Sequence, residues 1–319
     1  MKILNTIGEQ FAPEAKKILD RLGSVDYKSV TQIEFEKIVG VYDAIVVGLT
    51  PLINKAALVR AKCLKIIAIP ANTLTSIDLD YARAKGIRVV SLLGETAFLN
   101  TITSTAELAF GLIIALTRFI PWSFGAVKKY EWKREQFRGR MLYGKTLGVI
   151  GMGRLGRWIA RYAKSFKMAV VFYDPYVEKS SIPGCQRVSF GELLKQSDVI
   201  SLHVHLNQET EKMINVRSLK EMKKGVYLIN TAVAGLVDEQ ALLAALKQGR
   251  IAGYGTDILG DLSNFNSSLA AHPLVEYAKA NQNVIIVPRT GGMTHESRTR
   301  TDVFIAEKLA KYLKHAARN

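Results

Sequence analysis

Three glycines have the spacing of a dinucleotide-binding turn. Gly151, Gly153 and Gly156 form the pattern G-x-G-x-x-G directly after the apolar run 146–150, and a helical pattern follows them. The first glycine of such a motif permits a tight turn, the second lets the backbone approach a pyrophosphate, and the third lets the helix pack against the strand. The N–H groups at the start of the helix, together with its dipole, would face the phosphates. The spacing therefore predicts a dinucleotide site.

Asp174 is the residue that would choose between the two nicotinamide dinucleotides. It ends the next apolar run, 169–173, and lies 18 residues after Gly156 (174 − 156). A carboxylate there can accept hydrogen bonds from the adenosine ribose, and its charge would repel a 2′-phosphate. We therefore expect NAD as the cofactor rather than NADP. The alternative interpretation is an ordinary strand–turn–helix in which Asp174 is only a cap.

Strand patterns alternate with helical patterns along almost the whole chain. The apolar runs are 2–6, 44–48, 64–69 and 88–92, and then 146–150, 169–173, 199–202, 226–230, 251–257 and 283–287. Short apolar runs with helices between them are typical of parallel sheets. We expect an α/β protein, with a Rossmann-type doubly wound parallel sheet plus a smaller flavodoxin-like α/β domain.

The length of 319 residues suits two domains. We place a discontinuous substrate domain at residues 1–98 and 296–319, where the last helix packs back on the first domain. The NAD-binding domain is expected at residues 99–295, and it contains an arm near residues 120–140, of which the part 128–140 is basic.

The chain is strongly basic, with 44 Lys and Arg against 28 Asp and Glu, a net charge of +16. Such a charge raises nucleic acid or an anionic substrate as a partner. Because the charge is spread along the sequence, we favour a basic surface without a specific partner and do not expect nucleic-acid binding.

The cysteine content and the apolar pattern bear on the compartment. The two cysteines, Cys63 and Cys185, are too few for a disulfide framework or for a zinc site built from cysteines. The most apolar stretch, 108–117, is far shorter than the roughly 20 residues that span a bilayer. We expect a cytoplasmic protein with no membrane segment and no metal.

With the glycine motif in this context, the chain resembles the D-isomer-specific 2-hydroxyacid dehydrogenase family, which includes phosphoglycerate dehydrogenase. The matching segments include TAELAFGLIIALTR at 105–118, GKTLGVIGMGRLGR at 144–157, INTAVAGLVDEQALLAAL at 229–246 and VIIVPRTGG at 284–292. The resemblance implies an NAD cofactor and hydride transfer between a nicotinamide and a 2-hydroxy or 2-oxo acid. It also implies which residues line the cofactor, in addition to the motif glycines and Asp174: Arg154, Leu155, Val204, Asn207, Thr210, Thr231, Ala232, Asp257 and Gly291.

The family's three reacting side chains are not present at their positions. Val233 stands where the family has an Arg that grips the substrate carboxylate, and Leu262 where it has a Glu that orients a His. Arg289 occupies the place of that proton-exchanging His. Val and Leu carry neither charge nor proton, and Arg is a poor general base. We therefore expect ordinary 2-oxo acid reduction to be absent or very slow, and any activity to act on an unusual, anionic substrate.

Two other residues are the catalytic candidates. Arg289 could grip an anionic substrate, since its planar fork suits a carboxylate or a phosphate; the alternative is a structural ion pair with a carboxylate such as Glu296. His205 lies after a predicted strand and could exchange a proton at neutral pH, although a histidine at the rim of a sheet is more often only a satisfied polar group.

The arm carries the family's W-x-R-x-x-F-x-G spacing at Trp132 and Phe137, in a segment that supports homodimer contacts in that family. The resemblance therefore implies a homodimer. Two hypotheses other than an altered oxidoreductase stay open. The protein could be a non-catalytic NAD(H)-binding sensor or dimeric scaffold, or it could bind nucleic acid through its positive charge.

Overall fold

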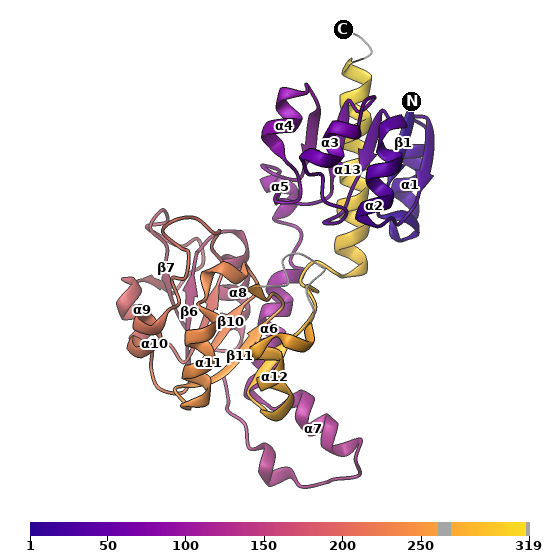
Figure 1. Ribbon diagram of the computed structural model, residues 1–319. Coiled ribbons are helices and arrows are strands. Elements are labelled where there is room, and N and C mark those ends of the chain that lie inside the picture. The colour runs from indigo at the N-terminus through magenta and orange to yellow at the C-terminus, as the bar shows by residue number, and fades with distance from the viewer. Residues whose placement is uncertain (261–268, 317–319) are drawn as a thin grey trace. The chain divides into compact units, whose positions relative to one another are not determined.

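The chain forms two compact units. The computed structural model describes residues 1–260 and 269–316 (Figure 1). Unit 1 comprises Met1–Ile102 and Thr294–Asn319, and unit 2 comprises Thr103–Met293. The sequence placed these boundaries at 98/99 and 295/296. The stretch up to Ile102 belongs to unit 1 because Arg300 donates hydrogen bonds to the carbonyl and the hydroxyl of Thr101.

Unit 1 contains a five-stranded parallel sheet in the order β2-β1-β3-β4-β5. The order 2-1-3-4-5 is that of flavodoxin-like folds, as expected. Its strands are β1 Lys2–Asn5, β2 Ser24–Tyr27, β3 Ala44–Val46, β4 Ile66–Ile69 and β5 Arg88–Ser91. Its helices are α1 Pro13–Asp20, α2 Gln32–Ile38, α3 Lys55–Arg60, α4 Leu79–Ala84, α5 Thr96–Leu99 and α13 His295–Ala316.

The last helix packs back on unit 1, as the sequence predicts. Ile305, Ala306 and Leu309 of α13 are fully buried in the cluster that also contains Leu19 of α1. The carboxylate of Asp302 is buried there as well, and its Oδ2 accepts a hydrogen bond from the backbone N–H of Ala12 at 3.2 Å. This contact ties the C-terminal helix to the start of α1.

Unit 2 contains a seven-stranded parallel sheet in the order β12-β11-β10-β9-β6-β7-β8. Its strands are β6 Thr146–Ile150, β7 Ala169–Tyr173, β8 Cys185–Arg187, β9 Val199–Leu202, β10 Val226–Asn230, β11 Ile251–Thr256 and β12 Val284–Ile286. The order is that of a Rossmann fold with one added strand. The strand order reverses between β6 and β9, and ligands of such sheets bind at the carboxyl ends of the strands beside that point.

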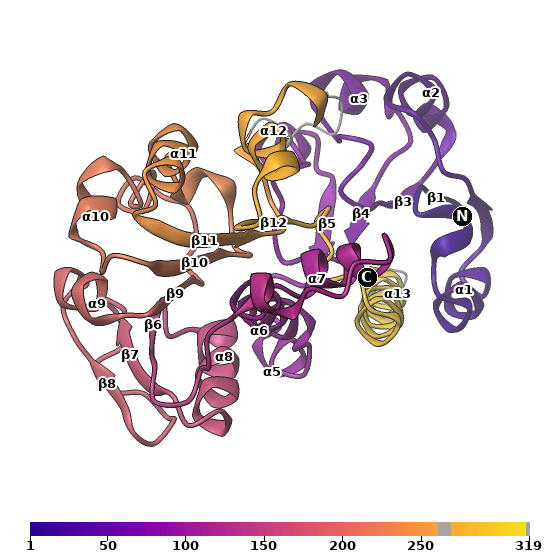
Figure 2. The same cartoon turned by 90° about the horizontal axis from the view of Figure 1, so that it is seen from below.

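Helices cover both faces of this sheet (Figure 2). The helices of unit 2 are α6 Ser104–Thr117, α7 Ile120–Val127, α8 Arg154–Ser165, α9 Phe190–Gln196, α10 Val216–Glu221, α11 Glu239–Lys247 and α12 Pro273–Ala280, of which α7 leads away from the sheet (Figure 1). Among the described residues, one helical stretch, Thr96–Thr117, is long and apolar enough to cross a membrane by length and composition. Ala109, Ile113 and Leu116 of this stretch are buried in the core that contains Leu147 and Ile229 of the sheet, so α6 is a core helix of unit 2.

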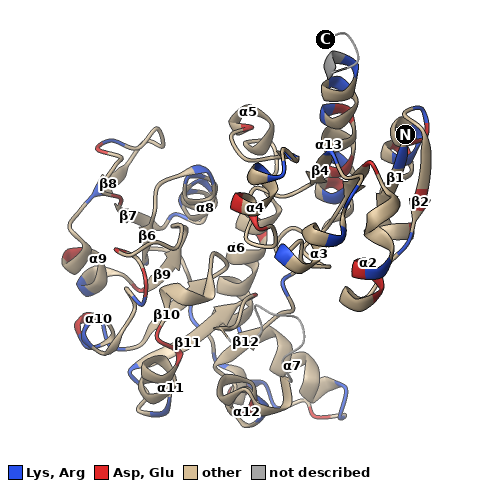
Figure 3. Cartoon of the chain, turned by 45° about the horizontal axis from the view of Figure 1, so that its top comes forward, with Lys and Arg blue, Asp and Glu red and all other residues tan. Residues whose placement is uncertain are grey.

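The basic residues are spread over the helices and loops of both units rather than gathered on one element (Figure 3). This distribution agrees with the interpretation of the charge as a general property of the surface.

Candidate active site

The glycine turn lies between β6 and α8, where its backbone demands glycine twice. Gly151 has φ +93°, and a Cβ there would lie 2.6 Å from the carbonyl oxygen of His203. At Gly156 a Cβ would lie 1.9 Å from the carbonyl oxygen of Gly151. A Cβ at Gly153 would meet nothing within 4 Å. The open space at Gly153 lies at the N-terminus of the 12-residue helix α8, as a pyrophosphate requires.

The carboxylate of Asp174 is held at the carboxyl end of β7. Its Oδ2 accepts a hydrogen bond from the N–H of Met152 at 2.8 Å, and its Oδ1 accepts one from the N–H of Tyr176 at 2.9 Å. The first bond joins Asp174 directly to the glycine turn. Each oxygen keeps further acceptor capacity, so the carboxylate can still receive the hydroxyls of a ribose.

The segment after β9 forms the wall opposite the glycine turn. Nε2 of His203 and the hydroxyl of Ser201 form a hydrogen bond of 2.9 Å. The other ring nitrogen, Nδ1, is buried and has no hydrogen-bond partner among the described residues. Burial lowers the pKa of His203 to about 4, so the ring is neutral at working pH. Val204 lies against the turn, since one of its methyl groups would be 2.7 Å from a Cβ at Gly151.

Beyond His203 the chain turns at residues 205–210. Asn207 and Thr210 brace this turn together: Asn207 N–H donates to the Thr210 hydroxyl at 2.8 Å, and Thr210 N–H donates to Asn207 Oδ1 at 2.9 Å. The Thr210 hydroxyl also donates to the carbonyl of His205 at 2.7 Å, and the His205 side chain is exposed. The two predicted cofactor residues therefore shape the loop, and the predicted proton carrier lies on its solvent side.

The strands β10 and β11 bring the remaining predicted residues to the same edge of the sheet. Thr231 is buried, and its hydroxyl has no partner in the described part of the chain. Val233 is half-buried and packs against the apolar core of unit 2, while its carbonyl accepts a hydrogen bond from Asn230 Nδ2 at 2.9 Å. The side chain that the sequence analysis expects at the position of the family's Arg is thus part of the core and offers no polar group to a substrate.

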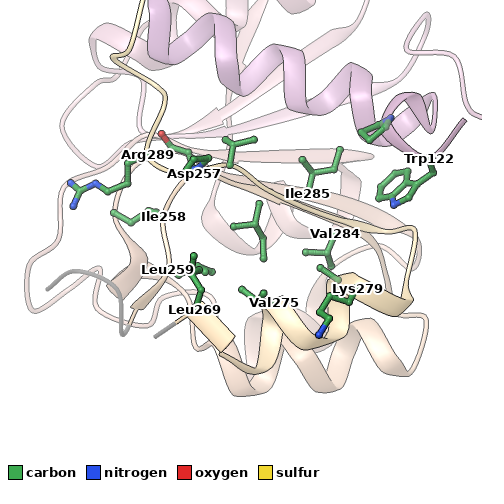
Figure 4. A pocket seen from close by; sticks show the side chains of 15 residues that line it. Trp122, Asp257, Ile258, Leu259, Leu269, Val275, Lys279, Val284, Ile285 and Arg289 are labelled. Carbon is green, nitrogen blue, oxygen red and sulfur yellow. The ribbon is translucent and has the colours of Figure 1, made fainter. Parts of the chain in front are cut away.

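Asp257 and Arg289 lie together at the reaction end of the site. Asp257 Oδ2 accepts a hydrogen bond from the N–H of Gly291 at 2.9 Å, and the Arg289 N–H donates to the Asp257 carbonyl at 3.0 Å. Burial raises the pKa of the Asp257 carboxyl, and the Gly291 bond and the charge of Arg289 oppose this rise. Gly291 allows the contact, because a Cβ there would lie 2.9 Å from Asp257 Oδ2. The hydrogen bond between Arg289 and Asp257 is thus made by their backbones, and Figure 4 shows the guanidinium directed away from Asp257.

The backbone of Arg289 is strained, with φ +51°, in the left-handed region that a long side chain rarely adopts. Such strain persists only where the surrounding contacts hold it, and it is common at functional sites. Here the holding contacts are the hydrogen bonds from the Arg289 N–H to the carbonyls of Asp257 and Val287, both at 3.0 Å.

A pocket of about 690 Å³ opens beside these residues within unit 2. Figure 4 shows Asp257 and Arg289 at one end and Trp122 and Lys279 at the other. The wall between them is apolar and comes from the loop after β11, from β12 and from α12. It includes Ile258, Leu259, Leu269, Val275, Val284 and Ile285.

Unit 2 thus gathers nearly all of the predicted cofactor residues along the carboxyl ends of β6, β7, β9, β10 and β11. Leu262, at the position of the family's Glu, lies outside the described residues. The sequence analysis did not single out His203, nor a buried pair of Glu239 and His272. Their signal is not local in the sequence, since the partners of the pair lie in different helices.

Residues 110–291 match the family model described as "D-isomer specific 2-hydroxyacid dehydrogenase, NAD binding domain". The chain belongs to the D-isomer-specific 2-hydroxyacid dehydrogenase family. The glycine turn, the space at Gly153 and the held carboxylate of Asp174 fit the cofactor that this domain is named for.

Three proteins show how far the family likeness extends. Glyoxylate reductase of Thermococcus litoralis is 37% identical over 283 residues, which cover 85% of this chain and 81% of that enzyme. D-3-phosphoglycerate dehydrogenase of Methanocaldococcus jannaschii is 34% identical over 98% of this chain, and the chain spans 58% of its length. The solved structure of D-lactate dehydrogenase of Aquifex aeolicus with NAD and lactic acid superposes with a TM-score of 0.82. It is 30% identical and covers 100% of this chain and 96% of its own.

Proposed function

We propose that this member of the family is an NAD(H)-dependent oxidoreductase whose reaction end no longer suits simple 2-oxo acids. Bound NAD supplies the acceptor or donor of a hydride. The observation that carries the proposal is that the glycine turn and Asp174 are complete while Val233 is packed into the core. The resemblance adds that Arg289 stands where the family is expected to have a proton-exchanging group.

In this proposal Arg289 binds the anionic group of the substrate. A guanidinium can orient a carboxylate or a phosphate through its planar set of donors, but it is a poor general acid or base. The proton is then exchanged by a different group, for which the exposed His205 on the loop after β9 is the candidate. Loss of the ordinary acid–base pair alone lowers a rate by about 10²–10⁴.

The test is an assay of NADH oxidation with glyoxylate, pyruvate and hydroxypyruvate. We expect wild-type protein that binds NADH to give no rate above background with any of them. Binding of a dianion such as oxalate to the NADH complex should be measurable and should be lost in Arg289→Leu. NADH binding without turnover on any anionic metabolite would favour the hypothesis of a non-catalytic sensor or scaffold. Clear reduction of a 2-oxo acid would contradict the proposal that the reaction end has changed.

We also propose that the protein works as a cytoplasmic homodimer that associates through the arm. The arm exposes large apolar side chains, among them Phe124, Tyr130, Trp132, Met141 and Tyr143, and Tyr130 is 99% exposed. An exposed apolar set of this size is typical of an interaction surface. Sedimentation of the wild type is expected to give a dimer that Trp132→Ser weakens; a monomer at all concentrations would contradict this.

A further inference from the structure

A largely buried histidine–glutamate pair links α11 to the start of α12, the helix that lines one side of the apolar pocket. Nε2 of His272 lies 3.3 Å from Oε2 of Glu239. The side chain of His272 is 4% exposed and that of Glu239 is 20% exposed. Glu239 is the first residue of α11, and His272 is the residue that caps the N-terminus of α12.

Both ring nitrogens of His272 and both oxygens of Glu239 are in use. Nδ1 of His272 accepts the N–H of Leu274 at 3.3 Å, so the ring proton is on Nε2 and faces Glu239. The other oxygen of the carboxylate, Oε1, accepts the N–H of Gly260 at 3.0 Å. One carboxylate thereby joins three elements: the start of α11, the loop after β11 and the start of α12.

This bridge fixes both walls of the pocket. Gly260 is the last described residue before 261–268 and follows the pocket residues Asp257, Ile258 and Leu259. His272 starts the helix that supplies Val275 to the opposite wall. Gly260 is also close to the carboxylate, because a Cβ there would lie 3.1 Å from Glu239 Oε2. The loop and α12 therefore cannot shift without breaking a buried hydrogen bond.

We propose that Glu239 and His272 are positioning residues for the nicotinamide end of the cofactor. They hold the loop after β11 so that Asp257 keeps its place beside Gly291 and Arg289. The inference rests on the proposed function and on the resemblance to the family, which implies that Asp257 lines the cofactor. Neither residue touches the cofactor; both act through the backbone between Asp257 and Gly260.

The two hydrogen-bond donors that face the Glu239 carboxylate define the variants that test this role. Two donors, Gly260 N–H and His272 Nε2–H, each face one oxygen of Glu239, and only a carboxylate offers an acceptor to both. In Glu239→Gln, one of the two donors must face an NH₂ group and lose its hydrogen bond. In His272→Asn, the Asn oxygen can still cap α12, but the contact with Glu239 is lost.

The experiment compares the affinities for NADH and for ADP-ribose, which lacks the nicotinamide. We expect Glu239→Gln and His272→Asn to weaken NADH binding about tenfold, as an unmade buried hydrogen bond would, and to leave the affinity for ADP-ribose unchanged. Glu221→Gln is the matched control. It makes the same chemical change in an ion pair with Arg217 on α10, and it should change neither affinity.

Equal weakening of both ligands would show a merely structural role and overturn the inference, and so would unchanged NADH binding in the folded variants. If Glu239→Gln does not fold, His272→Asn carries the test with the same readout. A wild-type protein that binds neither ligand would instead reject the cofactor site, and the positioning role with it.

Discussion

The two ends of the cofactor site are built by different means. The adenosine end is formed mainly by the backbone. A Cβ at Gly151 or Gly156 would lie less than 3 Å from a backbone carbonyl oxygen, and the carboxylate of Asp174 accepts hydrogen bonds from two backbone N–H groups. At the reaction end of the proposed site the residues come from separate loops, and there we expect Val233 and Arg289 to depart from the family. In the proposed function, a subsite built from the backbone persists while the side chains beside it change its chemistry.

The largest effect should come from restoring the family's side chains at the reaction end. The triple variant Val233→Arg, Leu262→Glu and Arg289→His should raise 2-oxo acid reduction by about 10²–10⁴ over the wild type, since it returns both the carboxylate clamp and the acid–base pair. Steady-state NADH oxidation with glyoxylate measures it. Continued inactivity of a variant that binds NADH normally would show that these three positions alone do not explain the loss of activity.

A smaller effect is expected at the adenosine end. Gly153→Ala adds a methyl group that meets no protein atom within 4 Å but enters the space of the pyrophosphate. We expect unchanged thermal stability and NADH affinity lowered by about tenfold or more, by analogy with the cost of displacing a close polar contact. Gly111→Ala inside α6, where a Cβ also meets nothing, should leave the NADH affinity unchanged. Unaltered NADH binding by Gly153→Ala would mean that the phosphates lie elsewhere.

The smallest effect on the cofactor, none at all, is expected from a change in unit 1. Burial raises the pKa of the Asp302 carboxyl to about 6, although Arg298 and the Ala12 N–H oppose the rise. A carboxyl whose folded-state pKa is raised favours the fold most below its ordinary pKa, and this stability is lost as the pH rises through about 6.

Asp302→Asn keeps an oxygen for the Ala12 N–H and removes the titrating charge. The Tm of this variant should therefore fall less than that of the wild type between pH 4 and pH 7, while NADH affinity stays the same. Thermal unfolding across this range measures the difference. Parallel pH profiles for the two proteins would show that Asp302 does not govern this dependence.

The fold could be predicted from the sequence where apolar runs are long and bounded by turns. Strands β6, β7, β9 and β10 have the expected limits, and the expected flavodoxin-like and Rossmann-type sheets are present. The sequence analysis did not predict the strands β2 and β8, because each is a short strand at the edge of its sheet and neither has a fully buried residue. Partial exposure leaves no apolar run to detect.

The site residues also differ in whether the sequence could predict them. The glycine turn and Asp174 are close in sequence, and their spacing is fixed by one strand–helix–strand unit, so the pattern alone located them. The pair of Glu239 and His272 and the buried ring of His203 depend on loops that meet only in the folded chain. No spacing rule connects residues 239, 260 and 272, so their bridge could be found only from the structure.

The most direct test of the account is one titration followed by one addition. NADH is added to the purified wild-type protein while energy transfer from tryptophan is followed, and glyoxylate is then added to the saturated complex. The account predicts saturable NADH binding and no subsequent oxidation above background. NADH oxidation by the wild type would contradict the claim that the reaction end has changed, and absence of NADH binding by folded protein would contradict the claim that the adenosine end is intact.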